Sequence, residues 1–113
     1  MLKKIEHVAV MASDFEKAIE FYTKYLGFEV FRRIENRLVF LKLGDSLLEI
    51  EPVNYSSYQH IGVNHFSLLA ENIDEEVRKL EKLGIKFIIN PTKDHKFAAF
   101  TGPDGVIIEL IER

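Results

Sequence analysis

An internal repeat constrains the fold of this 113-residue chain more than any other feature of its sequence. Each half contains a His that is followed by a Glu: His7 precedes Glu49 by 42 residues, and His65 precedes Glu109 by 44. All four residues lie inside apolar runs of the kind that form β-strands. A period of this length is typical of a fold built from two copies of one structural unit.

Further landmarks repeat between the halves. Each His is followed by a Leu-Gly pair, and the Gly comes 20 residues after the first His and 19 after the second. These pairs are Leu26-Gly27 and Leu83-Gly84. A Phe precedes each Glu by nine residues, as Phe40 and Phe100. Because several landmarks agree, we interpret the chain as two copies of one module that differ by an insertion of a few residues.

Each half predicts one helix and four strands. Ser13-Asp14-Phe15-Glu16 has the form of a capping box, which predicts a helix over about 14–26. Asn72, with Glu75 three residues later, predicts the start of a second helix. Each helix is expected to end at its Leu-Gly pair, since Gly suits the left-handed position after a helix. Apolar runs predict strands at 3–11, 28–33, 37–43, 47–51, 62–69, 86–89, 97–100 and 106–111.

We therefore expect an α+β fold of two paired βαβββ modules that form a cupped, mixed β-sheet. A single module would cover one face of its sheet with a helix and leave the other face open, so pairing would enclose a concave surface. The length suits one compact domain, residues 1–113. Within it we place module one at about 1–52, a linker at 53–60 and module two at about 61–113.

Composition excludes several classes of function. The net charge is −3 and no basic stripe is present, which argues against a nucleic-acid partner. The chain has no Cys, so neither a disulfide framework nor a thiolate site can form. We find no apolar signal core or membrane-spanning run and expect a cytoplasmic protein without a membrane partner. We also expect a homodimer, because open sheets present edges and apolar faces that a second copy would cover.

The four repeated residues predict a metal site. A carboxylate on an apolar strand face costs several kcal/mol to bury alone, and a divalent cation removes that cost. Two imidazoles and two carboxylates suit one divalent transition metal, namely nickel, zinc, cobalt, manganese or iron. A single strand His or Glu is more often a surface or hydrogen-bonded residue. That alternative gives no reason for the pattern to occur twice, so we predict His7, Glu49, His65 and Glu109 as metal ligands.

The chain resembles the vicinal oxygen chelate superfamily, the glyoxalase/bleomycin-resistance group, over its whole length. The most specific matching segments are FYTKYLGF at 21–28 and PDGVIIEL at 103–110. The surroundings of three ligand candidates also match, in His7-Val-Ala-Val, Leu48-Glu49 and Asn64-His65-Phe66. These motifs are specific for the superfamily and do not name one activity within it.

The ligand order His-Glu-His-Glu resembles that of lactoylglutathione lyase, glyoxalase I. The resemblance implies a metal-dependent lyase or isomerase that moves a proton next to a metal-chelated carbonyl or hydroxyl pair of a small-molecule substrate. It also implies Glu49 and Glu109 as the candidate catalytic bases. The chain departs from glyoxalase I at Met11 and Val53, where an Arg and an Asn would help to bind the glutathione carboxylate. A glutathione adduct is therefore not the expected substrate.

Other functions of the superfamily stay open as alternatives. The chain could be a methylmalonyl-CoA epimerase-like isomerase, or a non-enzymatic protein that sequesters a ligand as bleomycin-resistance proteins do. A ring-cleaving dioxygenase or a fosfomycin-modifying thiol transferase is disfavoured, because three ligands usually suffice there. Further polar candidates lie in two loops. In the first, Tyr55, Tyr58 and His60 could line the mouth of the cleft, although such loop residues more often pack locally or face solvent. In the second, Lys93, His95 and Lys96 could meet a substrate carboxylate or phosphate, with a solvated loop as the alternative.

Overall fold

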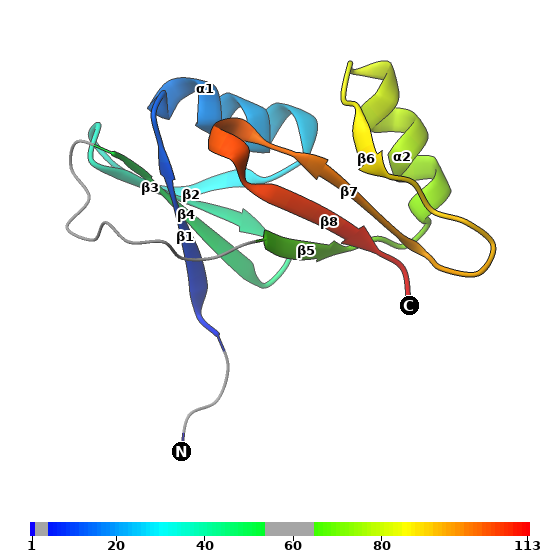
Figure 1. The fold of residues 1–113 in the computed structure, drawn as a ribbon. Helices are drawn as coiled ribbons and strands as arrows, with labels where there is room; N and C mark the ends of the chain where they lie inside the picture. Colours follow the sequence, from blue (N-terminus) through cyan, green and yellow to red (C-terminus); the bar gives the residue numbers. More distant parts are fainter. Residues whose placement is uncertain (2–4, 54–64) are drawn as a thin grey trace. The chain divides into compact units, whose positions relative to one another are not determined.

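The computed structural model describes residues 1, 5–53 and 65–113 and divides into two compact units, Met1–His60 and Ile61–Arg113, here called module one and module two (Figure 1). Module one contains β1 (His7–Ala12), α1 (Phe15–Glu20), the π-helical turn η1 (Phe21–Tyr25), β2 (Glu29–Ile34), β3 (Leu38–Leu43) and β4 (Ser46–Pro52). Module two contains β5 (His65–Leu69), α2 (Ile73–Lys82), β6 (Phe87–Ile89), β7 (Phe97–Thr101), the 3-10 turn η2 (Pro103–Gly105) and β8 (Ile107–Ile111). The predicted α+β fold with two βαβββ modules is confirmed.

The two sheets share one topology. Module one has the strand order β1-β4-β3-β2, and module two has the order β5-β8-β7-β6. In each sheet the first and last strands of the module pair in parallel at one edge, and the remaining pairs are antiparallel. Both sheets are therefore mixed, as predicted. The repeated His and Glu residues lie on the two strands of each sheet that pair in parallel.

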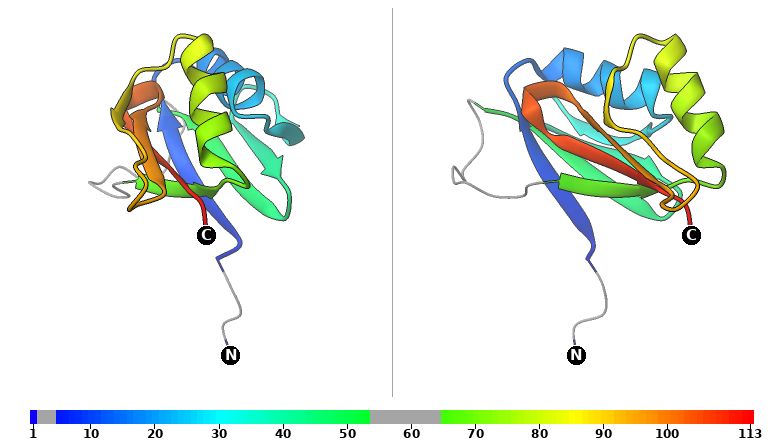
Figure 2. Two further views of the ribbon diagram at one scale, coloured as in Figure 1. Left: turned by 90° about the vertical axis from the view of Figure 1, so that its right-hand side faces the viewer. Right: turned by 45° about the vertical axis from the view of Figure 1, so that its right-hand side comes forward.

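A helix covers one face of each sheet. In module two, Figure 2 shows α2 lying against the strands in both views, and its apolar residues Ile73, Val77 and Leu80 are buried. In module one, α1 contacts β4. Side chains alternate along a strand, so Leu48 and Ile50 pack into the buried core while Glu49 points to the opposite face. We call this opposite face of each sheet the site face.

The helix starts follow the expected chemistry with one correction. Asn72 caps α2 as predicted, since its side chain accepts a hydrogen bond from the backbone N–H of Glu75 at 3.1 Å. The cap of α1 is Asp14, whose carboxylate accepts from the backbone N–H of Lys17 at 3.1 Å. The predicted cap at Ser13 was wrong by one residue, because a carboxylate serves as well as a hydroxyl and lies one step nearer the helix.

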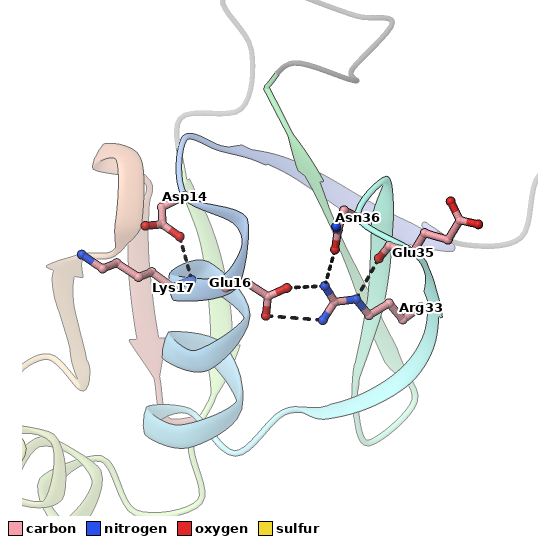
Figure 3. Close-up of polar contacts among 6 residues, drawn as sticks. All are labelled: Asp14, Glu16, Lys17, Arg33, Glu35 and Asn36. Atoms are coloured by element: carbon pink, nitrogen blue, oxygen red, sulfur yellow. Dashed lines mark hydrogen bonds and ion pairs between the residues drawn. The ribbon is translucent and has the colours of Figure 1, made fainter.

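A polar cluster ties the start of α1 to the β2–β3 hairpin (Figure 3). The Arg33 guanidinium contacts both carboxylate oxygens of Glu16 on α1. It also donates to the Glu35 carbonyl at 2.8 Å and to the Asn36 side-chain oxygen at 3.0 Å, and it lies over the Phe15 ring. Because one guanidinium serves four partners, this cluster fixes the hairpin against the helix within module one.

Parts of some predictions lie outside the described residues. These are the N-terminal end of the first predicted strand, most of the predicted linker 53–60 and the start of the strand predicted at 62–69. Among the residues that the structure does describe, no helix has the length and apolar character needed to cross a membrane.

Candidate functional site

The first His–Glu pair forms on the parallel strands β1 and β4. In the register of this pair of strands, His7 lies opposite Leu47 and Ala9 lies opposite Glu49. His7 and Glu49 are therefore diagonal neighbours on the site face of module one. The Nε2 atom of His7 lies 3.2 Å from Oε1 of Glu49. Residues that are 42 positions apart in the sequence thus meet because their strands are paired.

Three neighbours shape this pair. The Glu6 carboxylate lies 2.6 Å from Nδ1 of His7, so the other ring nitrogen faces Glu49. The ring of Phe40, which lies opposite Glu49 on β3, meets the His7 ring edge-to-face at 5.2 Å. Burial raises the pKa of the Glu49 carboxyl above its ordinary value; the nearby Glu51 carboxylate raises it further, and His7 lowers it. Glu49 is only 8% exposed, and a nearby cation would relieve the cost of burying its charge.

The second pair repeats the arrangement of the first. His65 lies opposite Ile107, and Ser67 lies opposite Glu109, on the parallel strands β5 and β8. The Nε2 atom of His65 lies 3.5 Å from Oε1 of Glu109. The Ser67 hydroxyl donates a hydrogen bond of 2.6 Å to the same carboxylate oxygen. The parallel strands have the same register in both modules, so His65 and Glu109 are diagonal neighbours, as His7 and Glu49 are.

The four predicted site residues are thus found as two pairs, one in each module. Within the described ranges, no group of three or more His, Cys, Asp or Glu side chains is arranged to hold a metal ion. In each pair, nevertheless, an imidazole nitrogen faces a carboxylate oxygen. Both atoms are ordinary ligands of transition metals. A ligand His usually has its other ring nitrogen held by a carboxylate or carbonyl, and Glu6 would fill that role if His7 bound a metal. The donor set therefore fits a divalent transition metal.

One landmark of the sequence repeat has no structural counterpart. Phe40 lies opposite Glu49, whereas the residue opposite Glu109 is Ala99, and Phe100 lies opposite Ile108 instead. Phe100 is fully buried in the core of module two. The reason is the hairpin loop: two residues separate the paired ends of β3 and β4, and five separate those of β7 and β8. An odd difference in loop length moves a side chain to the other face of a strand.

Glu6 and Ser67 were missed in the reading of the sequence. Glu6 precedes the first His by one residue, and Ser67 follows the second His by two. The one signal for Ser67 was strand alternation, which places it on the same face as His65. Nothing in the sequence indicated which carboxylate its hydroxyl would contact.

Two of the three loop candidates of module two, His95 and Lys96, have partners within their own module. Lys96 Nζ lies 3.6 Å from a carboxylate oxygen of Asp74 on α2, and the His95 ring lies 4.6 Å from the ring of Phe97. These contacts hold the two side chains against residues of their own module. The other loop candidates, Tyr55, Tyr58 and His60, lie outside the described residues.

Comparison with known proteins supports one family. The sequence profile of the "Glyoxalase/Bleomycin resistance protein/Dioxygenase superfamily" matches residues 4–110. The uncharacterized protein YwbC of Bacillus subtilis (strain 168) is 33% identical over 126 residues, and the match covers the full length of both chains.

Solved structures share the fold at lower sequence identity. A lactoylglutathione lyase from Agrobacterium tumefaciens superposes with a TM-score of 0.83 at 24% identity, over 98% of this chain and 94% of the other. TnmS3, an antibiotic-binding protein from Streptomyces sp. CB03234, superposes with a TM-score of 0.79 at 24% identity, over 98% and 96% of the two chains. The same fold thus occurs in an enzyme and in a protein that binds an antibiotic.

Proposed function

We propose that this chain, which belongs to the Glyoxalase/Bleomycin resistance protein/Dioxygenase superfamily, is a metal-dependent lyase or isomerase of the glyoxalase I type. The observation that carries the proposal is the His–Glu contact that each module makes with the same register, at 3.2 Å and 3.5 Å. A structural role would explain one such pair but gives no reason for both modules to keep it. A metal site that takes ligands from both modules does give a reason.

We propose that His7, Glu49, His65 and Glu109 hold one divalent transition metal: nickel, zinc, cobalt, manganese or iron. The histidines would bind through Nε2, the nitrogen that faces the carboxylate in each pair. The two carboxylates would balance the charge of the cation, and the buried Glu49 would lose the cost of its burial. When bound, such an ion supplies a Lewis acid that polarises a substrate carbonyl or hydroxyl oxygen.

The proposed reaction moves a proton between neighbouring carbon atoms of a small molecule. The carboxylate of Glu49 or Glu109 removes a proton from the carbon beside the carbonyl, so a C–H bond breaks and an O–H bond forms. The electron pair of the broken C–H bond shifts between the two carbons, the hydroxyl proton passes to the former carbonyl oxygen, and the same carboxyl group returns its proton to the former carbonyl carbon, so the carboxylate is regenerated. No other reactant is consumed. In the metal-free chain, burial and the neighbouring Glu51 carboxylate raise the pKa of Glu49 above its ordinary value, so this carboxylate binds a proton more strongly than an ordinary glutamate does.

Two residues of module one bear on the class of substrate. Met11 and Val53 stand where an Arg and an Asn would bind a glutathione carboxylate in glyoxalase I, and neither side chain can make a charged hydrogen bond. We therefore propose a small molecule with two neighbouring oxygens other than a glutathione adduct. An epimerase-like reaction on a thioester would begin with the same removal of a proton beside a carbonyl, but the proton would then return to the same carbon.

A ligand-sequestering protein is the second candidate. The antibiotic-binding protein TnmS3 has the same fold, which supports the view that this scaffold can serve binding without chemistry. The two candidates differ in one respect that can be measured, because a sequestering protein has no need of a metal held by two histidines and two glutamates.

We also propose a homodimer. The edge strand β2 exposes Val30 and Phe31, which are 54% and 59% accessible. An edge strand with exposed apolar residues invites pairing with a second copy. Light scattering on the purified protein should give twice the monomer mass of 13.1 kDa; a monomer at all concentrations would contradict this part of the proposal.

The test of the function is metal content followed by activity. Elemental mass spectrometry of the purified, tag-free protein should find about one transition-metal ion for each set of four ligands. The metal-loaded protein should then convert a member of a panel of hemithioacetals and CoA thioesters, with incorporation of solvent deuterium at the reacting carbon. Failure to take up nickel, cobalt, zinc or manganese would favour the sequestering protein.

A further inference from the structure

The two carboxylates differ in the residue that lies opposite them on the first strand of each module. The register position opposite Glu49 is Ala9, and the equivalent position opposite Glu109 is Ser67. A methyl group cannot donate a hydrogen bond, whereas the Ser67 hydroxyl donates to Oε1 of Glu109 at 2.6 Å. The repeat is therefore broken at this position of the site face.

We propose that Ser67 is a positioning residue that holds the Glu109 carboxylate for metal binding, an inference that rests on the proposed function. Hydroxyl-to-carboxylate hydrogen bonds of 2.5–2.7 Å are the short, charge-assisted kind. This one acts on Oε1, the oxygen that also faces Nε2 of His65 at 3.5 Å. It therefore fixes the carboxylate in the orientation that points at the second histidine.

The exposure of the two carboxylates explains why only one needs this support. The Glu49 side chain is 11% accessible and has the Phe40 ring beside it, so packing limits its rotamers. The Glu109 side chain is 28% accessible and faces Ala99 at the position that corresponds to Phe40. A more exposed glutamate loses more side-chain freedom when it binds a metal. The Ser67 hydrogen bond removes part of that freedom beforehand, which raises the affinity for the ion.

The experiment is a Co²⁺ titration of the metal-free full-length chain, read by affinity and by the visible absorption of the bound ion. We expect Ser67→Ala to weaken Co²⁺ binding by about 10-fold or more, the effect usual for an outer-shell partner. The visible bands should shift as well, because the ligand geometry changes. Ser67→Thr keeps the donor and should bind within about threefold of the wild type, on the same scale.

Two controls separate the outcomes. Ala9→Ser places a hydroxyl at the matching position of module one and should leave affinity and spectrum near those of the wild type. Circular dichroism should show that Ser67→Ala keeps the fold, since the residue is exposed. Two results would overturn this inference and leave the proposed function standing. One is a Ser67→Ala variant that binds Co²⁺ with the affinity and spectrum of the wild type. The other is a Ser67→Thr variant that loses as much Co²⁺ affinity as Ser67→Ala does. A wild-type chain that binds no Co²⁺ would overturn the proposed function and this inference with it.

Discussion

His7 and Glu49 are 42 residues apart in the chain, yet the imidazole Nε2 lies 3.2 Å from the carboxylate Oε1. The parallel pairing of β1 with β4 makes this contact, and it places the glutamate on the face opposite the helix of module one. The carboxyl group is nearly buried there, so its protonation is linked to the stability of the protein.

Glu49→Gln should change how stability depends on pH in the metal-free protein. Burial raises the folded-state pKa of Glu49, so the folded chain binds more protons than the unfolded chain between the ordinary and the raised pKa. The free energy of unfolding therefore falls as the pH rises through that interval. A glutamine does not titrate, so the variant loses no free energy of unfolding over this pH interval. It should therefore be more stable than the wild type above the interval and as stable as the wild type below it.

Urea unfolding across a pH series measures this difference. Glu71→Gln is the matched control, because it removes one negative charge at an exposed position. A Glu49→Gln variant that follows the wild type at every pH would show that the carboxyl group carries no such linkage. Adding metal should reverse the order, since the amide is a weaker ligand than the carboxylate.

His65→Ala should abolish tight metal binding and leave a folded domain. The variant loses a ligand outright, so the affinity should fall by more than the roughly 10–100-fold typical of an outer-shell partner. Elemental analysis after dialysis against a limiting concentration of metal gives the stoichiometry, and circular dichroism reports the fold. His95→Ala is the control in the same module, where the ring contacts Phe97. Metal retained at the wild-type stoichiometry in His65→Ala would refute the site.

Glu109→Gln should weaken metal binding and suppress proton transfer. If its carboxylate is the base, the rate should fall by about 10²–10⁴-fold at saturating metal. If Glu49 is the base, the same loss should follow Glu49→Gln, and Glu109→Gln should lower the rate mainly through metal affinity. Rates measured over a range of metal concentrations separate the two cases, and an unchanged rate would remove Glu109 from the mechanism.

Arg33→Ala should lower the melting temperature at neutral pH by an amount that shrinks in acid. The hydrogen bond from Arg33 holds the pKa of Glu16 below its ordinary value. A lowered pKa contributes stability above the ordinary value, and this contribution is lost as the pH falls through the folded-state pKa. Arg32→Ala, at the adjacent exposed position, is the control. Equal losses from the two variants at neutral pH would show that the cluster of Figure 3 adds nothing specific.

The sequence by itself determined the repeated module and the place of the four candidate ligands within it. Strand alternation and helix periodicity are local properties, so the elements around His7 and Glu109 could be predicted from their own neighbours. The two helix ends at Gly27 and Gly84 were equally local, since both residues adopt the positive φ predicted for them. The cap of α1 was misplaced by one residue, because Ser13 and Asp14 are both good caps and only the backbone geometry chooses between them.

Only the tertiary structure decided which side chains meet across strands. The hairpin loops set the register, and their unequal lengths turned Phe100 into the core while Phe40 stayed beside Glu49 on the site face. The contact of Ser67 with Glu109 likewise depends on the pairing of β5 with β8. Such contacts join residues far apart in the chain, and a shift of one residue in register would move every one of them to the other face.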